Sequence, residues 1–293
     1  MSLRFKIVVP SYNSVKWIKK TLNSIVNQTY PYFDVCVIDD ASTEVKQWDI
    51  IQKYSSKNGW QAVRRKHNVG ALENIVMGIS MLDPDDEDVI LLLDGDDWFY
   101  NRNVLSKLAE AYNDPSTLMT YGQFLIYPRW KVGFCYEIPP EWLEKKNFRQ
   151  QEFIFSHLRS FKFKLWKQIR EEDLKDSQGN YYRSGWDLAI IYPLLEMTGG
   201  MGCKFIPNFL YVYNMDNPIN DCVIRREEQA NSAKEIRGKQ PYPQLYFFIP
   251  STHSKPILTP LRNGWTRLFL CMTTPRTYQI AFNKLIKMIF RCF

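Results

Sequence analysis

Short apolar runs alternate with helical periodicities over the first 125 residues of the chain. Runs rich in β-branched and aromatic residues predict strands, and apolar residues that recur every three or four positions predict helices between them. This alternation with short loops is typical of an α/β fold with a mostly parallel sheet flanked by helices. The predicted strands are Phe5–Val9, Tyr32–Ile38, Trp60–Arg65, Asp88–Leu93 and Leu118–Phe124, and helices are predicted near residues 15–28, 44–54, 68–79 and 103–112.

The pattern becomes less regular after Phe124. Residues 126–140 are rich in aromatic residues and proline, and residues 173–183 are polar. Pro193 would kink or break the helix that contains it. The periodicity predicts helices around residues 150–157, 164–170, 187–197 and 225–236, and strands at residues 203–206 and 209–213.

The most informative stretch is the predicted strand Val89–Leu93 and the acidic residues after it. An unbroken apolar run is typical of a central strand that is buried on both faces. Asp94, Asp96 and Asp97 follow directly, and ionised groups that close together repel one another and are costly to bury without a partner. A divalent metal that also binds a phosphate is the simplest partner, and a solvated acidic turn is the alternative.

A second predicted strand also ends in carboxylates, Asp39 and Asp40. Ligands of parallel sheets bind beyond the carboxyl ends of the strands, so the two acidic clusters are expected to share one crevice. Asp40 is also expected to cap the helix that begins near Glu44, because aspartate is a good N-cap. The crevice would contain Pro10–Asn13, Asp39–Asp40, Asn68–Gly70 and Asp94–Asp97.

The net charge of +7 resides near the end of the sequence. From Ile236 onward there are nine Lys and Arg residues and no acid. Thr274 and Pro275 predict a helix start, and residues 274–293 have the pattern of a basic amphipathic helix. Such a helix suits peripheral contact with an anionic membrane, and packing on the preceding domain is the alternative. Nucleic-acid binding is not favoured, since the basic residues are dilute and no recognition module is present.

The expected location is cytoplasmic, either free or at the cytoplasmic face of a membrane. The six cysteines are scattered singly with no zinc-site spacing, which favours a reducing compartment. The first residues predict a strand rather than a signal peptide. No stretch approaches the ~18 apolar residues of a membrane span.

Four segments together resemble a known family. FKIVVPSYN at residues 5–13, VCVIDDAST at 35–43, NVG at 68–70 and ILLLDGDDW at 90–98 are similar, in order and spacing, to family-2 nucleotide-sugar glycosyltransferases of the GT-A fold. The resemblance implies a GT-A, Rossmann-like domain over residues 1–215, with a nucleotide-binding half at 1–125 and an acceptor half at 126–215. Residues 216–293 would form a basic extension.

The resemblance also implies an activity and its residues. A sugar would move from a nucleotide-diphosphate donor, expected to be a UDP-sugar, to a hydroxyl of a glycan, lipid-linked or protein-linked saccharide. Asp39 would accept the N–H of a uracil base. Asp96, with Asp94 and Asp97, would hold Mn²⁺ or Mg²⁺ at the diphosphate. The nucleotide site would comprise Pro10, Ser11, Tyr12, Asn13, Asp39, Asn68, Gly70, Asp94 and Gly95.

Inverting members of the family need a carboxylate to take the acceptor proton. The matching position is Asp187, after Gly185 and Trp186; a charge favoured by the helix dipole is the alternative. Weaker acceptor-site candidates are two tryptophans, which are as often core anchors, and a His-Arg pair, which would equally suit a solvated basic turn. These candidates are Trp98, Trp186, His157 and Arg159.

One feature departs from the family pattern. Many relatives carry a histidine near the positions of residues 214–221 that completes the metal site, and this sequence has none there. Asp216, Asn217 or water would then replace it. Two other functions stay open at this point: a haloacid-dehalogenase-like phosphatase, whose Asp-x-Asp is here followed by the atypical Trp98, and a catalytically inactive GT-A fold that binds a sugar or partner.

Overall fold

A computed structural model describes residues 2–219 and 225–245 of the chain. A sheet of nine strands runs through these residues in the order β3-β2-β1-β4-β8-β6-β9-β5, and β7 pairs with β6. The strands are β1 (Phe5–Ser11), β2 (Phe33–Asp39), β3 (Gln61–Arg64), β4 (Val89–Leu92), β5 (Trp98–Phe99), β6 (Met119–Tyr127), β7 (Lys131–Val132), β8 (Ser160–Lys162) and β9 (Cys203–Asn214).

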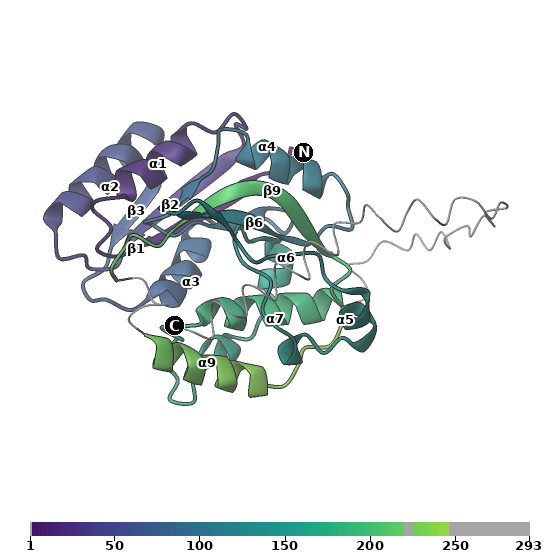
Figure 1. Ribbon diagram of the computed structural model, residues 1–293. Helices are drawn as coiled ribbons and strands as arrows, with labels where there is room; N and C mark the ends of the chain where they lie inside the picture. Colours follow the sequence, from purple (N-terminus) through teal and green to yellow (C-terminus); the bar gives the residue numbers. More distant parts are fainter. Residues whose placement is uncertain (1, 220–224, 246–293) are drawn as a thin grey trace. The chain divides into compact units, whose positions relative to one another are not determined.

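The first half of the sheet is parallel and confirms the α/β prediction. β1 lies between β2 and β4 and is parallel to both. All seven residues of β1 are buried, because helices cover both faces of the sheet (Figure 1). Helices α1 (Ile18–Val26), α2 (Val45–Asn58) and α4 (Val104–Tyr112) lie over one face, and α3 (Ala71–Met81) lies over the other.

The second half of the sheet is mixed, because β8 enters antiparallel between β4 and β6. The sequence predicted a helix at residues 150–157 here, and this prediction is wrong. A short 3₁₀ turn, η1 (Phe148–Gln150), is followed by irregular chain. Residues 154–162 are all buried, whereas an amphipathic helix would leave one face in water. The helix predicted at residues 164–170 is only α6 (Phe163–Trp166).

Two predicted strands merge into the long strand β9, which is parallel to β6 with a register shift at Gly122 and Gln123. The shift lets the chain pass the irregularity between residues 206 and 209 without ending the strand. Helix α7 (Trp186–Thr198) stays continuous past Pro193, so the predicted break does not occur. The remaining short elements are α5 (Pro140–Lys145) and the 3₁₀ turn η2 (Glu171–Leu174).

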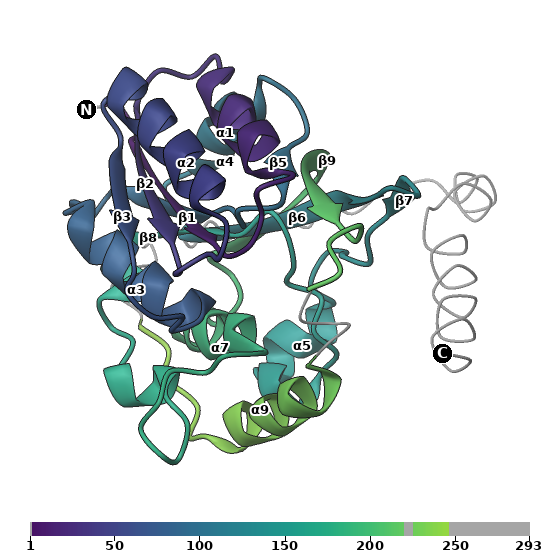
Figure 2. The ribbon, with the colours of Figure 1, turned by 90° about the vertical axis from the view of Figure 1, so that its left-hand side faces the viewer.

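Helix α9 (Arg226–Gly238) lies outside α7, as Figures 1 and 2 show. The buried Arg149 joins the two helices: its Nε donates to Glu196 of α7 at 2.6 Å, and its Nη1 donates to the carbonyl of Ile236 at 2.5 Å. All described residues therefore belong to one compact unit, Met1–Pro250. The predicted helix at 274–293 lies outside the described residues. Among those that are described, no helix is long and apolar enough to span a bilayer.

Candidate active site

A cleft of about 240 Å³ opens at the carboxyl ends of β2, β1 and β4, with the N-terminus of α7 on its opposite side. The two acidic strand ends therefore meet, as the sequence predicted for parallel strands. Arg183, which the sequence analysis did not single out, adds a cation to the wall. The lining includes Pro10, Ser11, Tyr12, Asp40, Asn68, Gly70, Asp94, Gly95, Asp96, Asp97, His157, Arg159, Arg183, Trp186 and Asp187.

Beneath the β1 side of the cleft, the buried side chain of Gln47 connects three segments. Its Nε2 donates to Ser11 Oγ at 2.9 Å and to Asp39 Oδ1 at 3.1 Å, and its Oε1 accepts from the backbone N–H of Ser14. Asp39 is fully buried, with Arg64 Nε 3.1 Å from its second oxygen. Asp39 thus supports the cleft floor rather than lining it. Gln47 and Ile51 lie on the same buried face of α2. This spacing of four residues is the one feature of the sequence that indicates a buried position for Gln47.

Asp40 does not cap α2, contrary to the prediction. Its carboxylate instead accepts hydrogen bonds from the backbone N–H groups of Val69 and Gly70 and from the Asn68 side chain, each at 2.9 Å. Gly70 has a φ of 95°, which glycine adopts at little cost. Asp40 therefore holds the loop that begins α3 against the end of β2. Arg183 reaches the same loop and donates to the Asn68 carbonyl at 3.2 Å.

Asn13, predicted at the nucleotide, connects the β1 loop to the loop before α2. Its Oδ1 accepts from the backbone N–H of Thr43 at 2.9 Å, and its own N–H donates to Ser42 Oγ. Trp98, predicted as an acceptor contact, is buried with Trp17 and Val212, and the Lys20 ammonium lies 3.4 Å from its ring centre. Neither residue lines the cleft in the described structure.

Position 95 requires a glycine because β1 comes very close to the backbone there. A Cβ at this position would meet Ser11 Cβ at 2.5 Å. We expect Gly95→Ala to lower the free energy of unfolding by about 1–3 kcal/mol, because the backbone of one strand end must move. Urea unfolding measures the effect. Gly238→Ala is the matched control, since nothing lies within 4 Å of its added Cβ; equal stability of both variants would contradict the close approach.

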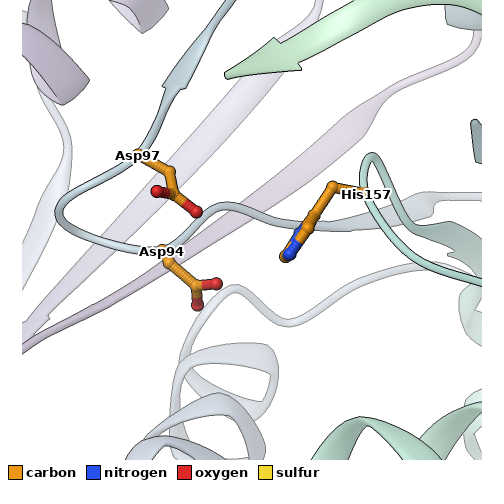
Figure 3. A group of neighbouring side chains, drawn as sticks. All are labelled: Asp94, Asp97 and His157. Atoms are coloured by element: carbon orange, nitrogen blue, oxygen red, sulfur yellow. The ribbon is translucent and has the colours of Figure 1, made fainter. Parts of the chain in front are cut away.

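Three side chains converge at the β4 end of the cleft. Ligand atoms of Asp94, Asp97 and His157 all lie within 4.8 Å of one another, and Figure 3 shows them pointing toward a common space. The two aspartates follow β4, whereas His157 comes from the irregular chain before β8. A histidine does therefore approach the acidic cluster, from a different segment than residues 214–221.

Strand β9 orients the acidic residues. Tyr211 Oη donates to Asp97 at 2.6 Å, and the Asn214 backbone N–H donates to the other oxygen of Asp97 at 2.7 Å. Asn217 Nδ2 donates to Asp96 at 2.7 Å, while Asp216 pairs with Lys16. Burial, and then the charges of Asp96 and Asp94, raise the pKa of the Asp97 carboxyl well above its ordinary value.

His157 is buried against two aromatic rings and is not part of a solvated turn. Its ring stacks on Tyr211 with centroids 4.4 Å apart and on Tyr213 at 5.2 Å. Burial, and then the positive charge of Arg159, lower the pKa of His157 well below its ordinary value. The imidazole is therefore neutral at physiological pH, which is the form that binds metals.

Asp187 begins the opposite wall, in the first turn of α7. Gly185 precedes the helix with a φ of 65°, a conformation that glycine adopts readily. The Asp187 carboxylate lies 3.1 Å from Arg159 Nη2, and the Arg159 guanidinium also faces the ring of Trp186. Arg159 is buried, so it fixes the orientation of a carboxylate that stays accessible from the cleft.

The sequence profile of glycosyl transferase family 2 matches residues 6–177, which is more than half of the chain. The chain belongs to this family. Membership of this family excludes the phosphatase alternative, which is wrong. The matched region includes β1, both acidic strand ends and His157; Asp187 lies beyond it.

Two curated relatives match a shorter part. The chain is 32% identical over 114 residues to the poly(ribitol-phosphate) beta-N-acetylglucosaminyltransferase TarS of Staphylococcus aureus, covering 38% of this chain and 19% of that protein. It is 26% identical over 128 residues to the hyaluronan synthase of Streptococcus pyogenes, covering 39% and 28%. This chain thus spans less than a third of the length of either relative in these matches.

Solved structures share the fold. The structure of S. aureus TarS residues 1–349 with UDP-GlcNAc superposes with a TM-score of 0.61 at 17% identity, covering 84% of this chain and 69% of that one. The mannosyltransferase PcManGT of Pyrobaculum calidifontis, with GDP-Man and Mn²⁺, gives a TM-score of 0.54 at 17% identity, covering 83% and 66%. At this identity the likeness establishes the GT-A fold.

Proposed function

We propose that this enzyme transfers a sugar from a UDP-sugar to the hydroxyl of a glycan, lipid-linked or protein-linked saccharide, with inversion at the anomeric carbon. One observation carries the proposal. Asp94, Asp97 and a neutral His157 converge at one end of a cleft, and Asp187 lies on its opposite wall. A donor diphosphate and an acceptor hydroxyl would thus meet complementary groups from two sides.

The side chains that converge at this end of the cleft are suitable ligands for Mn²⁺ or Mg²⁺. Carboxylate oxygens and a neutral imidazole suit Mn²⁺, and the oxygens alone suit Mg²⁺. Asp97 is almost completely buried beside two other carboxylates, a costly arrangement that a cation would relieve. When bound, the cation would neutralise charge that develops on the leaving diphosphate. Asp94, Asp97 and His157 would hold it, whereas Asp96, the principal ligand predicted from the sequence, lines the same cleft but is not among these three converging side chains.

The β1 side of the cleft suits a nucleoside. Tyr12 is partly exposed there and offers a ring for stacking on a base, while Arg183 offers a cation near the diphosphate. UDP-GlcNAc, the ligand named in the TarS structure, is the first donor to test. Asp187 would take the proton from the acceptor hydroxyl as the C–O bond forms, and Arg159 would hold its carboxylate toward the reacting centre.

Calorimetric titration of UDP-GlcNAc and other nucleotide sugars, with Mn²⁺ and with EDTA, tests the proposal. We expect binding of a UDP-sugar that depends on the cation, and release of UDP when an acceptor is added. NMR of the product should show an inverted anomeric configuration. Metal-independent transfer or retention of configuration would contradict the mechanism, and donor binding without turnover on any acceptor would favour the inactive alternative.

Tyr211→Phe is expected to weaken Mn²⁺ binding about 10–100-fold, the usual effect of losing a hydrogen bond to a metal ligand. The phenylalanine ring keeps the stacking on His157, whereas the hydroxyl that orients Asp97 is lost. Calorimetry with Mn²⁺ alone measures it. Tyr112→Phe is the control, because the Tyr112 hydroxyl pairs with Ser160 in the core. Unchanged Mn²⁺ affinity of Tyr211→Phe would remove the orienting role.

A further inference from the structure

A row of exposed apolar side chains lies on the hairpin formed by β6 and β7. Trp130, Val132 and Phe134 are 52%, 41% and 45% exposed; we call these three residues the hairpin ridge. Single exposed apolar residues are common on protein surfaces, but several that cluster usually mark a contact site. In Figure 2 the hairpin extends away from the body of the enzyme, so the ridge is accessible.

Contacts within the hairpin orient the ridge. The Gly133 N–H donates to the Phe124 carbonyl at 2.8 Å, and a Cβ on Gly133 would meet the Phe124 ring at 2.4 Å. Cys135 is also buried. Two of the ridge rings also pack within the hairpin, since Phe134 lies edge-on to Phe124 and Trp130 lies edge-on to Tyr127, with ring centroids 5.6 Å apart in both pairs. These contacts orient the ridge, and about half of the surface of its three side chains stays exposed.

The charges around the ridge are positive. Arg129 and Lys131 are exposed and alternate with the ridge residues, and neither has an ion-pair partner among the described residues. Residues 117–136 contain no Asp or Glu, and residues 128–136 contain no Asn or Gln either. A saccharide subsite needs such side chains for the sugar hydroxyls. Aromatic and aliphatic residues interleaved with Arg and Lys instead suit the interface of an anionic bilayer.

The hairpin begins beside the active site. Tyr127, its last β6 residue, pairs with Asn214 and accepts a hydrogen bond from the Met215 N–H at 2.9 Å. The Asn214 N–H is the donor to Asp97. A surface bound at the ridge would therefore lie near the metal-binding end of the cleft. This proximity matters only for an acceptor that is itself held at that surface.

We propose that the hairpin ridge, with Arg129 and Lys131, docks this enzyme on an anionic lipid bilayer and presents the cleft to a lipid-linked acceptor. The second part rests on the proposed function, whereas bilayer docking does not. The apolar residues enter the headgroup region, and the two cations pair with lipid phosphates. The ridge and the predicted helix at residues 274–293 are different segments of the sequence, so variants distinguish the two.

Vesicle flotation of the full chain tests the docking, with phosphatidylcholine vesicles or vesicles that also contain about 30% phosphatidylglycerol. We expect flotation only with the anionic vesicles and its loss near 0.5 M salt, where the screening length falls to about 4 Å. Combined Trp130→Ser and Val132→Ser, and separately Arg129→Ser with Lys131→Ser, should each lower the partition coefficient by about tenfold or more. No donor or acceptor is needed, so the result is independent of glycosyl transfer.

Tyr32→Ser with Val45→Ser is the matched control, since both residues are exposed apolar side chains on other elements. The control should float like the unmodified enzyme, and all variants should keep their Tm and their turnover of a soluble acceptor. Equal flotation of the ridge variants and the unmodified chain would overturn the proposal. A raised KM for a soluble saccharide in the ridge variants would overturn the proposal in favour of a saccharide site. A dimer that the ridge substitutions dissociate would overturn it in favour of a contact between two copies of the chain.

Discussion

Asp97→Asn is expected to lower kcat by about 10³-fold or more and to make the metal-free enzyme more stable. Loss of cation-based charge neutralisation at the leaving group removes several kcal/mol of transition-state stabilisation. The buried Asp97 carboxylate is repelled by Asp96 and Asp94, and an asparagine removes that repulsion while it still accepts from the Asn214 N–H. We expect the Tm in EDTA to rise by roughly 2–6 °C.

The two measurements together separate a functional carboxylate from a structural one. A structural aspartate would lose stability on substitution, whereas a ligand-binding aspartate gains stability and loses Mn²⁺ affinity. Asp49→Asn, at an exposed position of α2, is the control and should change neither quantity. Near-normal turnover with unchanged Mn²⁺ affinity in Asp97→Asn would show that Asp97 does not hold the cation.

Asp187→Asn is the second substitution with a large expected effect. It keeps the shape of the side chain and a hydrogen-bond acceptor for Arg159, but it removes the basicity. We expect kcat to fall by about 10²–10⁴-fold, the usual contribution of a positioned base, while the affinity for UDP with Mn²⁺ stays unchanged. Steady-state kinetics with saturating donor and calorimetry of UDP binding measure the two quantities separately.

Glu172→Gln is the matched control for Asp187. Glu172 lies in η2, its side chain is 73% exposed, and it does not line the cleft in the described structure. The control should retain full turnover. Asp187→Asn turning over near the unmodified rate, or inactivity of Glu172→Gln instead, would show that the base lies elsewhere.

Much of the nucleotide-binding half could be predicted from local sequence. β1, β2 and β4 each contain a run of consecutive apolar residues, Ile7–Val9, Val35–Ile38 and Val89–Leu92, and the polar residues at the strand ends follow soon after those runs. Parallel strands then bring their carboxyl ends to one edge, so the meeting of Asp40 with Asp94 and Asp96 follows from the pattern alone. The four motifs that place the chain in its family lie in the same region.

The neighbours of these residues could not be predicted in the same way. His157 and Arg159 belong to a buried run with no periodicity, because β8 and the chain before it contact other elements on every side. Nothing in the local pattern indicates that His157 reaches Asp94, or that Arg159 reaches Asp187. The predicted helix at residues 150–157 was wrong for the same reason.

The sequence by itself determined the parallel half of the sheet, the acidic strand ends and the start of α7, since each depends on residues adjacent in the chain. Only the tertiary structure decided what surrounds them. Tyr211 and Asn214 of β9 orient Asp97, and Gln47 connects Ser11 with Asp39. A buried polar group needs a hydrogen-bond partner, but the partner can come from any segment that folding brings near.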